Sequence, residues 1–334
     1  MQPPMTPDHG GLQLLLPRLW RSRGLVPRLL LPASWLYRGV SAARRVCYAH
    51  GPCRVRRFPR PVVVVGGISV GGSGKTPVVM HVARLLAGQG FHPGIVSRGY
   101  GGRRQHLPLW VDAGTPAAEC GDEPAMLARN LDVPVVVDPD RPRGVNSLID
   151  KAGCDVVISD DGLQHYAMDR QVEIIVLGGG SAGNGWCLPA GPLREPLSRL
   201  EEADLVVCNG GRARPGRYAM RLRIDALRPL DGEADSPPAS WAGRRVHAVA
   251  GIGNPDGFFN ALAALGIEVE PHPFPDHHHF RAADFSAMSG MPIVMTEKDA
   301  VKCGTLKLDD AWYARASVEL DQGFDTRLIE LLTL

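Results

Sequence analysis

An α/β fold built on a parallel sheet is predicted by two features of the 334-residue sequence. Residues 62–65 are four consecutive valines, and such a run of β-branched residues is typical of a strand buried on both faces. From this run onward, strand-like and helix-like stretches alternate, which indicates a sheet covered by helices on both faces. Strands are expected at 62–65, 94–97, 133–137, 156–159, 174–177 and 205–208, with helices at 77–89, 123–131 and 145–152.

The first strand leads into a glycine loop that ends in Lys-Thr at the start of a helix, which is the arrangement of a P-loop NTPase. Loop amides and the helix N-terminus would face the phosphates of a nucleotide, Lys75 would reach the β- and γ-phosphate oxygens, and the Thr76 hydroxyl could contact Mg²⁺. The strict spacing has glycine where this chain has Ser69. A glycine-rich turn without nucleotide is the alternative, but it leaves Lys-Thr unexplained. The nucleotide-binding residues expected are Gly71, Gly72, Ser73, Gly74, Lys75 and Thr76.

The chain is long enough for two domains, each with its own core. Residues 1–58 form a basic, apolar N-terminal segment, and residues 59–211 are expected to form the P-loop domain. Residues 212–240 are rich in Arg, Pro, Gly and Asp, which predicts a boundary. A second alternation predicts a smaller α/β domain over 241–334. Its strands are expected at 246–250, 267–270 and 292–295, and its helices at 256–265 and 282–289.

Composition is that of an ordinary globular protein, with 44% hydrophobic and 22% charged residues. The seven cysteines show neither a C-x-x-C pair nor an even framework. This pattern favours a reducing compartment and argues against structural zinc. No secretory cleavage pattern is visible at the N-terminus.

The N-terminal segment carries a marked charge asymmetry. Between Asp8 and Asp112 the chain has no acidic residue but 16 Lys and Arg. In the first sixty residues, arginines are interleaved with Leu, Trp and Tyr, and the longest apolar run is far shorter than the roughly 20 residues of a spanning helix. Such a segment suits the interface of an anionic membrane, which is the interpretation preferred here. Packing on the body of the protein and binding to nucleic acid are the alternatives.

Two acids end the strand-like stretch 156–159, and a second acidic pair stands at a glycine turn. Asp160 and Asp161 should emerge beside the P-loop, because ligands of an open α/β sheet lie beyond the carboxyl ends of its strands. One of them can hold Mg²⁺, directly or through water. Asp122 and Glu123 follow Gly121 at the start of a predicted helix. Spacing alone favours a helix cap with a first-turn acid over a chemical role for that pair.

Three further segments carry side chains that could take part in chemistry. Residues 277–279 are three histidines behind Asp276, which could form a metal site, a carboxylate-held histidine for proton transfer, or a surface loop without chemistry. The glycines of 251–257 deviate from a dinucleotide fingerprint and predict a tight strand-to-helix loop. The Gly- and Pro-rich stretch 184–196 contains Arg194, a candidate clamp for a transferring phosphoryl group.

Taken in order, these motifs resemble the tetraacyldisaccharide 4'-kinase family of lipid A biosynthesis. The resemblance runs through 30–37, the P-loop, 96–102, 121–124, 158–165, 184–197, 251–255, 274–277 and 295–300. Gly67, where the family usually has Asn, and the surroundings of 209–211 depart from the pattern. The resemblance implies ATP-dependent phosphorylation of the 4'-hydroxyl of an acylated glucosamine disaccharide 1-phosphate. It also implies two α/β domains with the site between them, and docking on the cytoplasmic face of the bacterial inner membrane.

Residue roles follow from the same resemblance. Asp122 would be the base that accepts the sugar hydroxyl proton, supported by His277. Lys75 would hold the phosphates, and Thr76 and Asp161 would surround Mg²⁺. The supporting residues implied are Asp160, Glu123, Arg194 and Glu195. The expected cofactors are thus ATP and Mg²⁺, and the expected partners are the lipid substrate and an anionic membrane surface, without nucleic acid and with the protein as a monomer.

A membrane-cycling ATPase of the partition or targeting type, without lipid kinase activity, is the main alternative function. Those proteins also use Gly-Gly-x-Gly-Lys-Thr, but they carry a signature lysine just before the glycine pair. Val70 occupies that position here, which argues against this interpretation. A non-catalytic nucleotide-dependent membrane adaptor is a third possibility, and it would need neither Asp122 nor His277.

Overall fold

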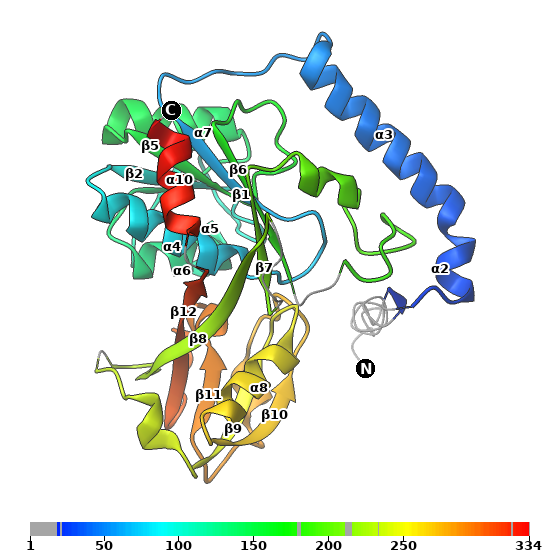
Figure 1. Cartoon of the computed structure of the whole chain (residues 1–334). Coiled ribbons are helices and arrows are strands. Elements are labelled where there is room, and N and C mark those ends of the chain that lie inside the picture. The colour runs from blue at the N-terminus through cyan, green and yellow to red at the C-terminus, as the bar shows by residue number, and fades with distance from the viewer. Residues whose placement is uncertain are drawn as a thin grey trace, which may run out of the picture.

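The computed structural model describes residues 19–20, 22–178, 182–210, 216–232, 234–321 and 323–333. Its centre is a twelve-stranded, mostly parallel sheet of order β10-β9-β11-β12-β8-β7-β6-β1-β5-β2-β4-β3. Figure 1 shows two lobes placed end to end along this sheet, with two N-terminal helices beside them. We call β1–β7 with α4–α7 the first lobe, and β9–β11 with α8 and α9 the second lobe.

The first lobe contains the strands and helices expected from the alternating pattern, with ends shifted by a few residues. Its strands are β1 (Val62–Gly66), β2 (Pro93–Ser97), β3 (Leu109–Val111), β4 (Val135–Val137), β5 (Val156–Asp160), β6 (Val172–Leu177) and β7 (Leu205–Asn209). Its α-helices are α4 (Lys75–Gly88), α5 (Ala117–Cys120), α6 (Asp122–Asn130) and α7 (Arg141–Ala152), and a 3₁₀ turn covers Leu197–Glu201. The three-residue β3 and the four-residue α5 were not predicted; β3 pairs antiparallel with β4 at the sheet edge.

Strand β1 is the centre of this lobe because all of its side chains are buried. It pairs in parallel with β5 on one side and β6 on the other. Val63 and Val65 join the apolar cluster on one face of the sheet, whereas Val62 and Val64 join the cluster on the opposite face. This alternation is the two-residue period of a strand, so the valine run fills both layers of the core.

The second lobe repeats the pattern on a smaller scale. Its elements are β9 (Arg245–Ala250), α8 (Pro255–Ala264), β10 (Glu268–Pro273), β11 (Ile293–Thr296) and α9 (Glu297–Cys303), with 3₁₀ turns at Pro238–Trp241 and Ala282–Phe285. The helix expected at 282–289 is therefore wrong in type and length: only a short 3₁₀ turn forms there. The strands expected at 246–250, 267–270 and 292–295 are confirmed with small shifts.

The stretch 212–240 is not an irregular linker, because β8 (Tyr218–Pro229) lies within it. This strand pairs antiparallel with β12 (Ala311–Leu320) and parallel with β7, so it joins the two lobes through the sheet. Its charged residues suggested a boundary, but they alternate with buried residues such as Ile224, as a half-exposed strand requires. After β12, helix α10 (Phe324–Thr333) returns to the first lobe, where Asp325 contacts His81 at 2.7 Å.

The described part of the N-terminal segment forms two helices, α2 (Leu25–Leu29) and α3 (Leu31–His50). Cys47 and Cys53 are joined by a disulfide after α3, which the spacing did not predict; the other five cysteines are buried. Within the described ranges, no helix combines the length and apolar character required to cross a bilayer. The apolar residues of 1–18, which contributed to the membrane interpretation, lie outside the described residues.

Candidate active site between the two lobes

The P-loop connects β1 to α4, as the motif predicts. Gly71 and Gly74 have φ values of 102° and 88°, a left-handed conformation that favours glycine. Gly74 caps α4, so Lys75 and Thr76 occupy its first turn, where backbone amides are suited to bind an anionic ligand. Ser69 pairs with Leu193 in an isolated antiparallel bridge. The departure from strict glycine spacing therefore falls at an extended position that accommodates a side chain.

Asp161 lies between two cations at the end of β5. Its Oδ1 is 3.7 Å from Lys75 Nζ, and its Oδ2 accepts a hydrogen bond from Arg194 Nη1 at 3.0 Å. Burial raises the pKa of Asp161, but Lys75 and Arg194 outweigh it, and the net pKa lies below the ordinary value. Asp161 also has a φ of 47°, an uncommon conformation outside glycine that points to a functional constraint. We call Lys75, Asp161 and Arg194 the phosphate cluster.

Asp160, the last residue of β5, is buried among polar groups. Ser97 Oγ donates to its Oδ2 at 3.3 Å, and its backbone carbonyl accepts from Arg141 Nη2 at 2.5 Å. Burial first, and then the charges of Glu123 and Asp161, raise the pKa of Asp160 to about 6. A buried carboxylate whose ionisation is opposed by two neighbouring acids is a favourable environment for a divalent cation.

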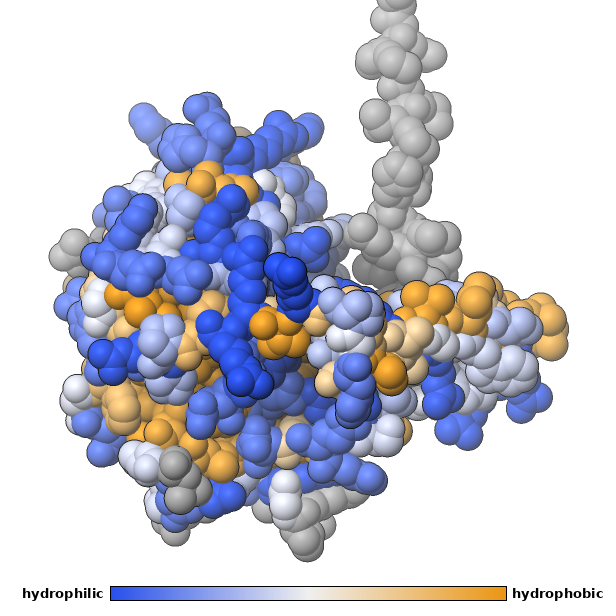
Figure 2. Space-filling view, turned by 90° about the horizontal axis from the view of Figure 1, so that it is seen from above, coloured by the Kyte–Doolittle hydropathy of each residue, from blue (hydrophilic) through white to orange (hydrophobic). Residues whose placement is uncertain are grey.

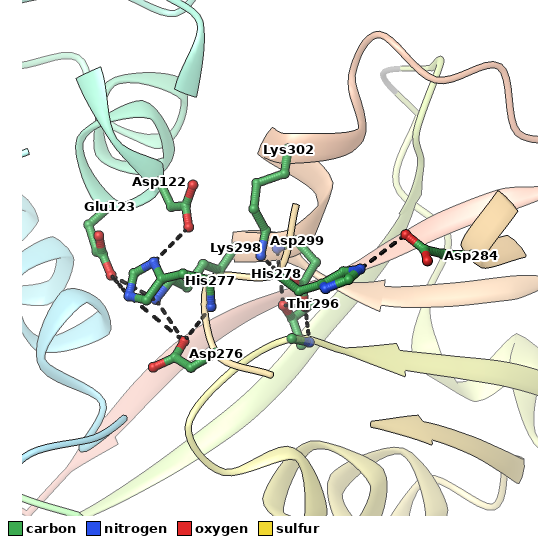
Figure 3. A network of polar contacts seen from close by, with 11 residues as sticks. Asp122, Glu123, Asp276, His277, His278, Asp284, Thr296, Lys298, Asp299 and Lys302 are labelled. Carbon is green, nitrogen blue, oxygen red and sulfur yellow. Dashed lines mark hydrogen bonds and ion pairs between the residues drawn. The ribbon is translucent and has the colours of Figure 1, made fainter. Parts of the chain in front are cut away.

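Asp122 meets His277 across the two lobes, as Figure 3 shows. Its Oδ2 is 2.9 Å from His277 Nδ1. Gly121 occupies the cap position of α6, and Asp122 and Glu123 lie in its first turn, as the spacing predicted for first-turn acids. The carboxylate of Asp122 nevertheless contacts His277, so helix capping alone does not describe this residue. Burial raises the pKa of Asp122, but the hydrogen bond from His277 and the nearby Lys302 and Lys298 lower it overall. The same hydrogen bond raises the pKa of His277.

Lys298, from the first turn of α9, connects the charged groups around this pair. Its Nζ is 2.7 Å from Glu123 Oε1 in the first lobe and 3.4 Å from Asp276 Oδ1 in the second. It also lies 3.4 Å from His277 Nε2. Burial lowers the pKa of Lys298, but Glu123 and Asp276 raise it overall, so it stays charged. The sequence predicted no role for Lys298, although it lies in the stretch 295–300 that resembles the family.

The three consecutive histidines do not converge on one point. His277 faces Asp122, whereas His278 Nε2 is 3.0 Å from Asp284 Oδ2 (Figure 3). His279 is exposed. A metal site built from all three is therefore not formed, and the carboxylate-held histidine is the interpretation that fits His277. His277 also has a φ of 60°, a left-handed backbone conformation that is uncommon outside glycine.

Gln164 is a second residue that sequence reasoning missed. Its Nε2 donates to Glu195 Oε1 at 2.7 Å and to the carbonyl of Gly67 at 3.1 Å, while its Oε1 is 3.4 Å from Arg194 Nη1. It thereby links the loop 184–196 to the end of β1. The only sequence signal was its place in the stretch 158–165, four residues after Asp160.

The glycine-rich loop 251–257, which follows β9, lies in close contact with the P-loop. A Cβ on Gly253 would lie 2.5 Å from the backbone nitrogen of Gly72, closer than real Cβ contacts. Asp299 holds this loop: its Oδ2 accepts from the amide of Gly251 at 2.9 Å, and its Oδ1 is 2.6 Å from Lys302 Nζ. The stretch 251–257 is thus a tight strand-to-helix loop that brings the second lobe to the first.

Helices α2 and α3 carry a set of exposed apolar side chains, seen in Figure 2 as orange residues along the arm that projects from the body. These exposed residues are Leu25, Val26, Leu29, Trp35, Leu36, Val40 and Val46. The opposite side of α3 is fixed to the loop 184–196, since Ser34 Oγ donates to the Cys187 carbonyl at 2.7 Å and the Tyr37 hydroxyl to the Arg194 carbonyl at 3.0 Å. Packing on the body therefore accounts for one side of α3, and no described residue covers the apolar side.

Comparisons with known proteins agree with this geometry. The tetraacyldisaccharide-1-P 4'-kinase family model matches residues 26–333. A tetraacyldisaccharide 4'-kinase of Azoarcus sp. is 47% identical over 330 residues, covering 96% of each chain, and one of Alkalilimnicola ehrlichii is 49% identical, covering 88% of this chain and 87% of that one. The crystal structure of LpxK from Aquifex aeolicus in complex with ATP has a TM-score of 0.77 and 31% identity, covering 92% of this chain and all of that one. The chain therefore belongs to the tetraacyldisaccharide 4'-kinase family.

Proposed function

We propose that this protein transfers the γ-phosphoryl group of ATP to the 4'-hydroxyl of a tetraacylated glucosamine disaccharide 1-phosphate. The observation that carries the proposal is the Asp122–His277 contact of 2.9 Å, in which a carboxylate of the P-loop lobe meets a histidine of the other lobe. A nucleotide-binding protein that transfers nothing needs a P-loop but has no use for such a pair. A kinase needs both, because its acceptor hydroxyl must be oriented toward the phosphates.

The phosphate cluster and the first turn of α4 fit a nucleotide. Lys75 and Arg194 place two positive charges beside the P-loop, where they would offset the charge that develops during transfer. Backbone amides of 71–76 would bind phosphate oxygens at the start of α4. ATP, when bound there, supplies the phosphoryl group. Among the described residues, Ser73 Oγ is buried without a hydrogen-bond partner, as expected of a group that meets a ligand.

The neighbouring carboxylates fit Mg²⁺. Asp161 Oδ1 is buried and, within the described ranges, accepts no hydrogen bond. Carboxylate and hydroxyl oxygens are the donors that Mg²⁺ prefers, and we place Thr76, Asp160, Asp161 and Glu123 around it. The ion would neutralise charge on the phosphates. The raised pKa of Asp160 fits this assignment, because a cation would relieve the repulsion among these acids.

Asp122 is the residue we assign to the sugar hydroxyl. Its lowered pKa keeps it ionised near pH 7, so its free oxygen can accept a hydrogen bond from the hydroxyl and then the proton. His277 holds the carboxylate in place through Oδ2. Because phosphoryl transfer demands little covalent chemistry from the protein, the main contribution of Asp122 is the orientation of the nucleophile.

A lipid substrate requires contact with a membrane, and α2 and α3 are suited to it. We propose that their exposed apolar residues enter the cytoplasmic leaflet of the inner membrane while neighbouring arginines meet anionic headgroups. The arrangement favours a peripheral or monotopic monomer, since the apolar side chains lie on one arm of the molecule (Figure 2). Nucleic acid is not an expected partner.

The direct test measures transfer of labelled phosphate from ATP to purified acylated disaccharide 1-phosphate in detergent with Mg²⁺. We expect a phosphorylated lipid whose label maps to the 4'-position. ATP hydrolysis without lipid labelling would support the partition-type ATPase instead. If nucleotide binds and neither reaction occurs, the adaptor function is favoured and the kinase proposal is lost.

The membrane proposal is tested by replacing three exposed residues of the arm with serine (Leu29→Ser, Trp35→Ser, Leu36→Ser). We expect binding to anionic vesicles to fall by at least about 10-fold, because full burial of even one large side chain contributes roughly 1.5–3 kcal/mol. Leu222→Ser, an exposed leucine on β8, is the matched control and should keep wild-type binding. Co-sedimentation with vesicles measures the effect. Unchanged binding by the triple variant would show that the membrane contact lies elsewhere on the protein.

A further inference from the structure

His247, Glu270 and His272 form a cluster in the second lobe that the kinase reaction does not use. His247 lies in the interior of β9, while Glu270 and His272 lie two residues apart on the neighbouring strand β10. The two strands are parallel, with Glu270 paired to His247 and His272 to Val249, so the three side chains share one face of the sheet. This face is opposite α8, which packs on Val246 and Ala248.

The three side chains present one ligand atom each at short range. His247 Nδ1 is 3.0 Å from His272 Nε2, Glu270 Oε1 is 3.5 Å from His247 Nδ1, and the same oxygen is 3.9 Å from His272 Nε2. These three edges define a triangle whose centre lies about 2.0 Å from all three atoms, which is the length of a Zn–N bond and within the range of Zn–O bonds. A single ion could therefore contact all three atoms without movement of the backbone.

The surroundings hold the ligands in this orientation. His247 is 4% exposed, and its ring meets that of His272 edge to face with centroids 5.1 Å apart. Arg245 Nη2 donates to Glu270 Oε2 at 3.3 Å, which leaves Oε1 toward the histidines. A hydrogen bond on the outer oxygen of a ligating carboxylate is a common second contact in metal sites. Within the described ranges, the other nitrogen of His247 has no hydrogen-bond partner, so Nδ1 is the atom through which this buried ring meets polar groups.

We propose that His247, Glu270 and His272 bind one divalent transition-metal ion of the zinc class. Two imidazoles and one carboxylate are the donor set that suits such an ion, and they leave a fourth position for water because Glu270 and His272 are part-exposed. The absence of a cysteine framework does not bear on this site, which contains no sulfur. The ion would join β9 to β10, the edge strand of the sheet, and thereby stabilise the second lobe.

The test uses the full-length protein with a tag that lacks histidine, stripped of metal and then titrated with Zn²⁺ against a chromophoric chelator. Excess Mg²⁺ is present throughout to occupy the carboxylates near the P-loop. We expect one Zn²⁺ per chain, and Co²⁺ substitution should give the intense visible absorption of a four-coordinate ion. Zn²⁺ at about 100-fold above its Kd should also raise the Tm by roughly 3 °C.

Variants separate this site from other histidines. His272→Asn and Glu270→Gln should each weaken Zn²⁺ binding by about 100-fold or more and abolish the Tm shift, because each removes one of three ligands. His92→Asn, an exposed histidine of the first lobe, and His277→Asn should keep wild-type binding. Circular dichroism verifies that each variant is folded; if His272→Asn is not, Glu270→Gln decides. Equal Zn²⁺ affinity in wild type and either ligand variant, or binding lost in His277→Asn instead, overturns the proposal.

Discussion

The two sides of the active site differ in how many parts of the chain they need. The phosphate cluster is assembled within the first lobe, from the start of α4, the end of β5 and the loop 184–196. The Asp122–His277 pair needs both lobes, since Asp122 begins α6 and His277 follows β10. Nucleotide binding should therefore depend on one lobe, whereas orientation of the acceptor should depend on how the lobes meet.

The largest loss of activity is expected from a change in the phosphate cluster, which lies within the first lobe. Lys75→Ala removes a charge 3.7 Å from Asp161. On our proposal, it also removes the cation that would hold the phosphates of bound ATP. We expect transfer to fall by about 10³-fold or more, as for loss of a preorganised electrostatic contact to the transferring group. Nucleotide binding should weaken as well, which a fluorescent ATP analogue would measure. Lys151→Ala, an exposed lysine at the end of α7, is the control; near-normal turnover by Lys75→Ala would refute the P-loop assignment.

Asp122→Asn tests the Asp122–His277 pair, which needs both lobes. The amide keeps the shape of the carboxylate but cannot accept the hydroxyl proton, so kcat should fall by about 10²-fold or more. The KM for ATP should change little, because Asp122 does not belong to the phosphate cluster. Asp132→Asn, just after α6, provides an exposed control. A large rise in the KM for ATP with unchanged kcat would show that Asp122 serves the nucleotide instead.

Sequence patterns predicted the phosphate cluster, which lies within one lobe, better than the Asp122–His277 pair, which needs both lobes. The reason is physical. Lys75, Thr76 and Asp161 follow strands, and their position at the sheet edge is fixed by local alternation and chain direction. Asp122 and His277 are 155 residues apart, and spacing alone assigned Asp122 to a helix cap. Only the resemblance to the kinase family predicted that these two residues act together. The family comparisons confirm the resemblance itself. The residue roles remain predictions for the experiments above.

The fold shows the same limit. Buried strands such as β1 were predicted because a run of valines leaves few alternatives. β8 was missed because its exposed charged residues resemble a linker as long as its pairing partner β12 is unknown, and that partner lies 83 to 100 residues away in sequence. Lys298 and Gln164 were missed for a similar reason: a lone lysine or glutamine carries no signal until its partners Glu123 and Glu195 are in place.

Gly253→Ala tests how much catalysis depends on the contact between the two lobes. Its new Cβ would lie 2.5 Å from the Gly72 nitrogen, so either the P-loop or the second lobe must shift. Since a displacement of about 1 Å can cost 10²-fold in rate, we expect kcat to fall roughly 10-fold. Gly304→Ala, where nothing lies within 4 Å of the added Cβ, is the control. Wild-type kcat and KM in Gly253→Ala would show that the lobes do not need this contact.

The smallest effect concerns the pH dependence of the Asp122–His277 contact. The pKa of His277 is raised, so its stabilisation is complete below the unfolded value of about 6.5 and is lost as pH rises through the higher folded value. The pKa of Asp122 is lowered, so its stabilisation is present above about 3.9 and is lost only as pH falls further. The pair should therefore stabilise the folded protein most between about pH 4 and 6.5.

His277→Asn should accordingly lower the Tm more at pH 6 than at pH 9, when both proteins are compared by calorimetry at each pH. The difference between the two pH values should be a few degrees, because the pair is only partly shielded from water. His279→Asn removes an exposed neighbour from the same loop and should show no such dependence on pH. If His277→Asn lowers the Tm equally at pH 6 and pH 9, His277 contacts Asp122 as a neutral ring. The contact between the lobes is then a hydrogen bond without an ionic component.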